Sequence, residues 1–271
     1  MPKYAILSDI HGNAAAFESV LARCAQCGVD KYICLGDIVG YNAEPARCMD
    51  IARSLNFAAA VRGNHDDYAV REDLENSGFN KNAKIAIQWT RDQLSPEQLE
   101  YLANLPMQQI LRECNATFVH ATLDTPESWG YVFDDHHAGS NFSYQLTRLA
   151  FCGHSHIPVA FDKAPLANGN RRPVEKILAW ENNLQYPEAD TDFSLCDELQ
   201  IQLERGHKYL FNIGSIGQPR NGDTRASFAI LDTDNDIVSR HRVPYDIADT
   251  QQKVLDAGLP TRLAERLGIG H

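Results

Sequence analysis

Five short apolar runs in this chain end in polar residues of the kinds that bind metal ions. The runs are strand candidates at 3–8, 31–36, 57–63, 116–120 and 149–154, and the sequences at or after their ends are SDIHGN, GDIVGY, GNHDD, H and GHSH. Ligands of open α/β sheets bind outside the carboxyl ends of the strands. The pattern therefore predicts a sheet with one edge that gathers Asp, His and Asn side chains.

The first three strand candidates alternate with helical patterns at 13–28 and 44–56. Strand–helix–strand alternation is typical of parallel strands joined by right-handed crossovers. Residues 80–104 have the pattern of a helix in two pieces. The first part of the chain is therefore predicted to form a β/α unit.

The pattern changes at about residue 157. Short strand candidates separated by Pro, Gly, Asn and Asp follow there: VAF, KILAW, LQIQL, KYLFNIG, ASFAILD and DIVSRHRV. A helical segment with a Gly-Leu-Pro break ends the chain. We expect a single domain over residues 1–271, with a motif-bearing β/α half at about 1–156 and a β-rich half with C-terminal helices at about 157–271.

Charge and composition narrow the classes of partner. The net charge of −11 argues against a protein that coats long nucleic acid or an anionic membrane. No apolar run approaches the length of a membrane span and no leader sequence is evident, so we expect a cytoplasmic protein without a membrane partner. The odd number of Cys residues, seven, favours a reducing compartment. Cys24 and Cys27 could form half of a zinc site or a redox pair, but their place at the end of a predicted helix favours a structural role. The sequence leaves the oligomeric state open.

The types of the polar residues indicate the kind of metal. Imidazole, carboxylate and amide groups together suit Mn, Fe, Zn, Co or Ni better than Ca. The candidate ligands are Asp9, His11, Asp37, Asn64, His120, His154 and His156. Seven ligands are too many for one tetrahedral site but fit two sites that share a carboxylate, and Asp37 is the predicted bridge. The i, i+2 spacing of Asp9 with His11, and of His154 with His156, would keep each pair on one face of an extended segment. Five of the remaining histidines are expected at the surface, although the first two could also line a substrate cleft: His136, His137, His207, His241 and His271.

The motifs D-x-H, G-D-x-x-G, G-N-H-D and G-H-S-H, with a single His after an apolar strand, resemble those of the calcineurin-like metallophosphoesterases. They span residues 9–156, and the likeness continues through 212–232 into the C-terminal tail. The resemblance implies an α/β fold in which a two-sheet β-sandwich is flanked by helices (αββα). It also implies two divalent metal ions.

The resemblance assigns each ligand to one of the two metals. Asp9, His11, Asp37 and His156 would hold the first, and Asp37, Asn64, His120 and His154 the second. His65 would be the catalytic acid, with Asp66 orienting its imidazole, whereas Asp67 is expected to be a solvated loop charge. The implied reaction is hydrolysis of a phosphomonoester, a phosphodiester or a small nucleotide by in-line attack of a metal-bridging hydroxide.

Further side chains could bind the phosphate group of a small substrate. Arg220 and Arg225 could supply positive charge, although both could equally be surface residues. Asn13 could reach the phosphate, but it could also cap the helix that follows it. Residues 121–148 and 157–205 would set specificity. The alternative functions are a catalytically silent metal-binding scaffold or interaction protein on the same fold, which should lack some of these residues, and a nuclease, which the acidic charge disfavours.

Overall fold

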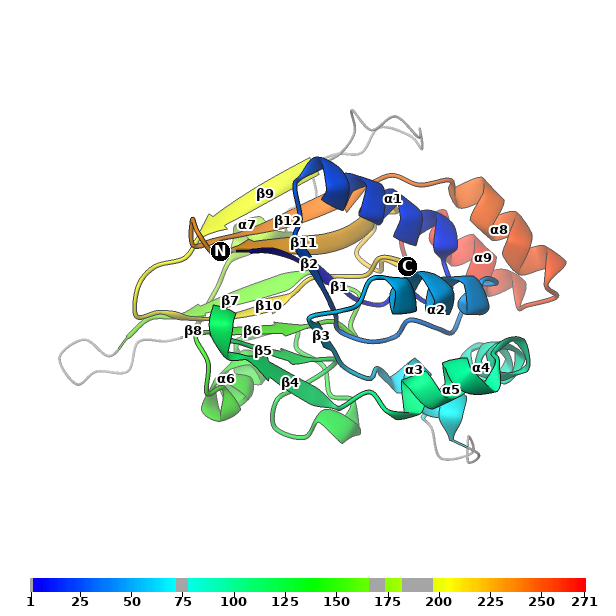
Figure 1. Ribbon diagram of the computed structural model, residues 1–271, viewed down its shortest axis with the longest axis horizontal. Coiled ribbons are helices and arrows are strands. Elements are labelled where there is room, and N and C mark those ends of the chain that lie inside the picture. The colour runs from blue at the N-terminus through cyan, green and yellow to red at the C-terminus, as the bar shows by residue number, and fades with distance from the viewer. Residues whose placement is uncertain (1, 72–77, 166–173, 182–196) are drawn as a thin grey trace.

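The computed structural model describes residues 2–71, 78–165, 174–181 and 197–271 (Figure 1). These residues form two six-stranded sheets. Sheet A has the strand order β3-β2-β1-β11-β12-β9, and sheet B has the order β4-β5-β6-β10-β7-β8. Each sheet contains strands from before and after residue 157, so the two halves of the sequence are interleaved in both sheets.

The strands of sheet A are β1 Lys3–Leu7, β2 Lys31–Cys34, β3 Ala59–Ala60, β9 Asp197–Gln202, β11 Ala226–Asp232 and β12 Ile237–Val243. The strands of sheet B are β4 Gln108–Leu111, β5 Ala116–Val119, β6 Leu149–Cys152, β7 Val159–Lys163, β8 Val174–Lys176 and β10 Lys208–Asn212. The α-helices are α1 Ala14–Gln26, α2 Pro45–Ser54, α3 Asn64–Val70, α4 Lys81–Gln93, α5 Pro96–Ala103, α6 Asp135–Tyr144, α7 Leu178–Glu181, α8 Ile247–Asp256 and α9 Thr261–Leu267.

The side chains of each strand point alternately to the two faces of its sheet, and this divides the apolar core into layers. In β1, Tyr4 and Ile6 face an apolar layer that also contains Phe118 and Phe211 from sheet B. The intervening residues of β1 belong to a second layer, which includes Phe17 of α1. Because successive side chains of a strand point to opposite faces, sheet A packs on sheet B through one face and on helices through the other.

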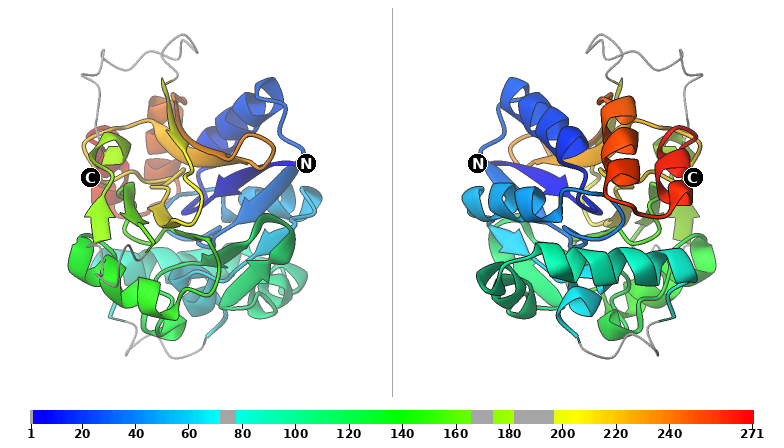
Figure 2. Two further views of the ribbon diagram at one scale, coloured as in Figure 1. Left: turned by 90° about the vertical axis from the view of Figure 1, so that its left-hand side faces the viewer. Right: turned by 90° about the vertical axis from the view of Figure 1, so that its right-hand side faces the viewer.

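Sheet B repeats this arrangement, with Leu210 facing a layer that contains Phe142 of α6. In Figure 1, α1 lies over sheet A and α6 lies beneath sheet B; the side views of Figure 2 show the same layers. A fourth apolar cluster joins α4 to α8 and α9 and includes Tyr41. The predicted fold, two sheets packed face to face with helices outside, is confirmed.

The five strand candidates with polar ends all form strands, but they are divided between sheets A and B, so the prediction of one sheet edge that gathers them is wrong. β1, β2 and β3 are parallel neighbours, and so are β5, β6 and β10. This arrangement brings the carboxyl ends of β1 and β2 together in one sheet, and those of β5 and β6 together in the other. The structure also confirms the helical interpretation of Cys24, which is buried in α1, and of Cys27, which is the C-cap residue of that helix.

Some predicted elements are wrong. KILAW was expected to be a strand, but β8 ends at Lys176 and α7 begins at Leu178. An apolar run this short fits a buried strand and a helical turn equally well. Helices α3 and α6 and strand β4 were not predicted. Part of the 157–205 region expected to set specificity lies outside the described residues.

Candidate metal centre and active site

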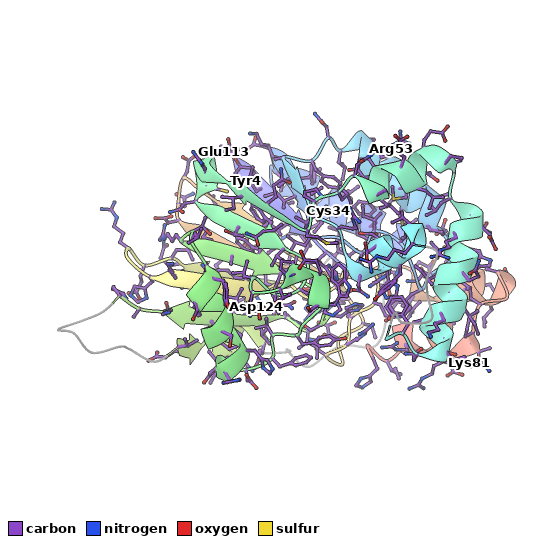
Figure 3. The ribbon with its side chains drawn as sticks, turned by 90° about the horizontal axis from the view of Figure 1, so that it is seen from below. Tyr4, Cys34, Arg53, Lys81, Glu113 and Asp124 are labelled. Atoms are coloured by element: carbon purple, nitrogen blue, oxygen red, sulfur yellow. The ribbon has the colours of Figure 1, made fainter. Side chains whose placement is uncertain are left out.

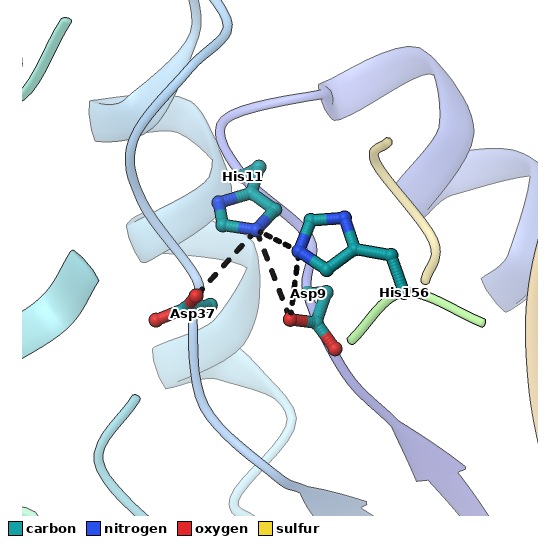
Figure 4. Close-up of side chains that lie close together, drawn as sticks. All are labelled: Asp9, His11, Asp37 and His156. Atoms are coloured by element: carbon teal, nitrogen blue, oxygen red, sulfur yellow. Dashed lines mark hydrogen bonds and ion pairs between the residues drawn. The ribbon is translucent and has the colours of Figure 1, made fainter. Parts of the chain in front are cut away.

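Four of the predicted ligands form one buried cluster where β1 and β2 end. Ligand atoms of Asp9, His11, Asp37 and His156 all lie within 4.8 Å of one another (Figure 4). The Nε2 atoms of His11 and His156 are 3.1 Å apart, and His156 Nε2 lies 3.2 Å from Asp9 Oδ1. Asp9 Oδ1 and Asp37 Oδ2 are buried and accept no hydrogen bond in good geometry. Buried carboxylate oxygens without a donor are costly unless a cation binds them. The cluster therefore fits a metal ion.

Backbone carbonyl groups fix the orientation of three imidazoles. The Nδ1 atoms of His11, His120 and His156 lie 3.0, 2.8 and 2.6 Å from the backbone oxygens of Val39, Leu35 and Gln218. A ring that donates from Nδ1 presents the lone pair of Nε2 to the centre, as metal-binding histidines do. Burial also lowers the pKa of His11 and of His156, which favours the neutral form that binds metal.

The other predicted ligands lie beside this cluster. His120 Nε2 is 3.1 Å from Asn64 Oδ1 and 3.4 Å from Asp37 Oδ2. Burial alone would lower the pKa of His120, but the Asp37 carboxylate outweighs it and raises this pKa to about 9. The ring of His154 lies 5.1 Å from that of His120. Its Nε2 contacts the backbone oxygen of Trp129 at 2.9 Å, which leaves Nδ1 as the nitrogen available to a metal.

The residues at the strand ends have an unusual backbone. The φ angles of Asp9, His11, Asp37, His154 and His156 are +53°, +51°, +55°, +66° and +60°. The left-handed region is uncommon for residues other than Gly, although Asp, Asn and His enter it most readily. The expectation that the i, i+2 pairs lie on extended segments is therefore wrong. The side chains converge on one centre although the backbone at each of these ligands leaves the extended conformation.

The backbone of Gly63, in the sequence RGNHDD, lies close to the backbone and the carboxylate of Asp37. A Cβ atom on Gly63 would lie 2.1 Å from Asp37 Oδ1, so only glycine fits there. The same carboxylate oxygen accepts a hydrogen bond of 2.7 Å from the backbone N–H of His65. Asn64 is the first residue of α3, so this segment is a helix and not the expected loop.

Asp66 does not orient His65 as the resemblance implied. Its carboxylate accepts hydrogen bonds from the backbone N–H groups of Asp37, Ile38 and Gly63 at 2.7, 2.9 and 3.1 Å. Burial and the nearby Asp37 carboxylate raise the pKa of Asp66 to about 7, in opposition to these amide donors. Asp66 ties the loop after β2 to the start of α3 and thereby positions the backbone of Asp37.

We expect Asp66→Ala to destabilise the protein whether or not His65 is present. It would leave several buried N–H groups without an acceptor, at a cost of about 1–3 kcal/mol for each group that stays unsatisfied. Urea unfolding of the metal-free protein measures this change in the free energy of unfolding. Asp66→Ala should lower the free energy of unfolding by the same amount when it is added to the His65→Ala variant. If it has no effect in that variant, Asp66 acts by orienting His65.

His65 is buried and contacts other rings. It stacks on Phe79 with 4.5 Å between ring centroids and lies 4.3 Å from the ring of Tyr41. Its Nδ1 has no hydrogen-bond partner. Burial lowers the pKa of His65 to about 4, so the ring is neutral in the metal-free protein. A phosphate group bound beside it would favour the protonated form.

His65 lines a cavity of 180 Å³, which we call the inner cavity. Its walls include the predicted ligands Asp37, Asn64, His154 and His156. Arg220 lies in the same wall, and its Nη2 atom is 3.2 Å from the hydroxyl of Tyr41. Arg220 is therefore placed to contact an anion in this cavity.

The structure does not place the other two predicted phosphate contacts in the inner cavity. The guanidinium of Arg225 pairs with buried Asp223, with 3.2 Å between Nε and Oδ1. Asn13 is buried and caps α1, with its Oδ1 accepting from the N–H of Ala16 at 3.1 Å. Both side chains stabilise the fold, Arg225 through an ion pair and Asn13 as the helix cap that the sequence offered as its alternative role.

Two polar residues expected at the surface are buried. Asp67 pairs with Arg62 at 3.0 Å and with Arg71 at 2.8 Å, so it is not a solvated loop charge. His241 is 2% exposed and stacks on Phe228. Both residues lie inside regular elements, α3 and β12, where burial depends on what packs against the element and not on local sequence.

Other residues of the inner cavity were not predicted. They include Tyr41, Phe79, Tyr131 and Arg266. Tyr41 ends the GDIVGY sequence that contains Asp37, so this motif could have indicated that Tyr41 lies near the metal centre. The remaining three come from separate parts of the chain that no motif marks.

Two sheets with a buried Asp and His cluster beyond the strand ends define a class of metal-dependent hydrolases. Residues 3–172 match the sequence model of the calcineurin-like phosphoesterase superfamily domain, and the chain belongs to this superfamily. The protein is a metal-dependent phosphoesterase, which confirms the prediction of an enzyme. None of the helices in the described part of the chain has the length and apolar character needed to cross a membrane.

Relatives extend the likeness to the whole chain. An uncharacterized protein from Methanocaldococcus jannaschii is 37% identical over 268 residues, which cover 98% of this chain and 97% of the relative. The crystal structure of a metallophosphoesterase from Sphaerobacter thermophilus is similar, with a TM-score of 0.78, 34% identity, and coverage of 100% and 99% of the two chains. A hypothetical protein from Pyrococcus horikoshii shares the fold, with a TM-score of 0.72 at 18% identity and the same coverage.

Proposed function

We propose that this phosphoesterase binds two divalent transition-metal ions that share Asp37. The observation that carries this proposal is the place of the Asp37 carboxylate between two groups of ligands. Its Oδ2 atom lies 3.5 Å from His11 Nε2 on one side and 3.4 Å from His120 Nε2 on the other. Asp9, His11 and His156 would complete one site, and Asn64, His120 and His154 the other.

The substrate would be a small phosphoester bound in the inner cavity. Two bound metal ions would neutralise phosphate charge and activate water for in-line attack on phosphorus. Arg220 would bind a phosphate oxygen. His65 would donate a proton to the leaving oxygen, a role supported by its place in the cavity wall beside the proposed ligands. The Phe79 ring stacked on His65 would exclude water from one face of the imidazole.

The metal content of the protein tests the two-site proposal. We expect close to two equivalents of Mn, Fe, Zn, Co or Ni after reconstitution of protein purified without chelator. His154→Ala should lower the content toward one equivalent, because it removes a ligand of only one site. Elemental analysis makes the measurement. A wild-type content of one equivalent that His154→Ala leaves unchanged would show that there is a single site.

Hydrolysis assays separate the enzyme from a silent scaffold on the same fold. Metal-stripped protein should be supplied with each candidate metal in turn and with phosphomonoesters and phosphodiesters, including p-nitrophenyl phosphate and bis(p-nitrophenyl) phosphate. At least one combination should be hydrolysed. If no phosphoester is cleaved while both metals are bound, the scaffold function is favoured.

A further inference from the structure

A second and larger cavity, which we call the outer cavity, adjoins the inner one. Its volume is 940 Å³, within the range of about 300–1,000 Å³ that is usual for small-molecule sites. The two cavities share the wall residues Tyr41, Asn80, Tyr131, Arg220 and Arg266. A substrate whose phosphate lies in the inner cavity can therefore extend into the outer one.

The outer cavity is strongly cationic. Four of its lining residues are Lys or Arg, and none of those in the described part of the chain has a carboxylate side chain. The four are Lys81, Arg220, Arg262 and Arg266. This local excess of positive charge contrasts with the net charge of −11 for the whole chain. A cationic pocket in an acidic protein is suited to attract and hold an anion.

The cations of the outer cavity have few counter-ions. Arg262 pairs with Glu265 at 3.8 Å, but both side chains are more than half exposed. Arg266 donates from Nε to the backbone oxygen of His271, and no described carboxylate side chain pairs with it or with Lys81. Burial and the neighbouring Arg220 lower the pKa of Arg266 to about 10. Like charges gathered with few counter-ions are unfavourable until an anion binds between them.

Aromatic rings form another part of the cavity wall. Tyr131 and Phe133 stack on each other with 5.3 Å between centroids, and they are 44% and 41% exposed. Tyr131 also stacks on His154, with 4.4 Å between centroids. The rings thus extend outward from a proposed metal ligand. Tyr131 is thus packed between His154 and Phe133, and the exposed ring of Phe133 is the platform on which a nucleic-acid base can stack.

We propose that the substrate is a nucleotide with more than one phosphate group. One phosphate would be cleaved at the metal centre, the base would stack on Phe133, and the second phosphate would bind to Arg262, Arg266 and Lys81. This inference rests on the proposed function and adds a substrate class to it. A phosphorylated peptide would satisfy the cations but would leave the aromatic platform without a matching ring.

The test compares substrates that differ by one group. Adenosine 3′,5′-bisphosphate and ADP carry a second phosphate that AMP lacks, and ribose 5-phosphate lacks the base. For the wild-type enzyme, kcat/KM for the better two-phosphate nucleotide should exceed that for AMP by about tenfold or more, the usual effect of hydrogen bonds to a charged group. The kcat/KM for AMP should exceed that for ribose 5-phosphate by about tenfold, because the base stacks on an aromatic ring.

Variants assign these preferences to residues. Arg262→Ala should abolish most of the preference for a second phosphate. Arg53→Ala is the matched control, because it removes an exposed Arg in α2 that lines neither cavity. Figure 3 labels Arg53 and Lys81 at opposite edges of the molecule. Phe133→Leu should abolish the preference for AMP over ribose 5-phosphate, and Phe133→Tyr should retain it.

The outcomes separate this inference from the proposed function. If both nitrophenyl esters are cleaved but the second phosphate and the base give no advantage, the substrate class is wrong and the phosphoesterase proposal stands. The proposed substrate class is also wrong if the variants lower kcat/KM equally for every substrate. It is wrong as well if the enzyme prefers a phosphopeptide to all nucleotides. If neither ester is cleaved with metals bound, the proposed function itself fails.

Discussion

Asp37→Asn should cost the enzyme both metal ions and nearly all activity. The substitution keeps an acceptor for the backbone N–H of His65, which now donates to Asp37 Oδ1. It replaces Oδ2, the atom between His11 and His120, with an NH₂ group that cannot bind a cation. The fall in kcat/KM should therefore exceed the about 10–100-fold typical for loss of an outer partner of a metal ligand.

Asp9→Asn is the matched control, because Asp9 and Asp37 are both almost completely buried. One oxygen of Asp9 already accepts hydrogen bonds from Ser8 Oγ and from the backbone N–H of His154, and only Oδ1 faces the cluster. Asp9→Asn should weaken one site and leave the other occupied. Elemental analysis and kinetics of both variants make the comparison. If Asp37→Asn retains two metal ions and most of its activity, Asp37 is not shared.

His65→Ala should slow hydrolysis by about 10²–10⁴-fold, the usual contribution of a positioned proton donor, and should leave the metal content nearly intact. The loss should be smaller for p-nitrophenyl esters, because nitrophenolate is a stable leaving group that needs little protonation. For an alkyl phosphodiester the full loss is expected. Single-turnover rates on both kinds of ester, with elemental analysis of the same samples, make the measurement.

Two results would count against a proton-transfer role for His65. Loss of a metal equivalent in His65→Ala would show that the imidazole is a ligand. An equal loss for good and poor leaving groups would show that His65 positions the phosphate. Tyr41→Phe is a useful comparison, because it keeps the ring that packs against His65 and removes only the hydroxyl that contacts Arg220.

The ligands could be predicted because their signal is local. A polar residue directly after a buried strand has few structural reasons to be there, and Asp9, His11 and His156 converge as expected. Side chains with several possible partners were harder to interpret. The Asp66 carboxylate could have bound an imidazole or backbone amides, and only the path of the chain after β2 shows that it binds the amides.

Features that depend on packing between distant segments could not be predicted. Arg266 and Tyr131 reach the same cavity from α9 and from the loop before α6, and no motif connects them. Helix α6 has a short polar sequence with an internal Gly, so its pattern resembles that of a loop. Asp67 is buried because Arg62 and Arg71 pair with it within the folded protein.

The left-handed backbone at the ligand positions has a consequence for variation in this enzyme. Each such residue costs about 1–2 kcal/mol relative to a right-handed conformation, whereas glycine adopts this geometry without that strain. Replacement of His154 or His156 by Gly would therefore relieve backbone strain in the metal-free fold while removing a ligand, whereas Asp9 also accepts buried hydrogen bonds that Gly would leave without an acceptor. A library selected only for thermal resistance would drift toward inactive sequences at these positions, and one selected for turnover would keep the strained residues. Stability and activity thus impose opposite preferences at the same few sites.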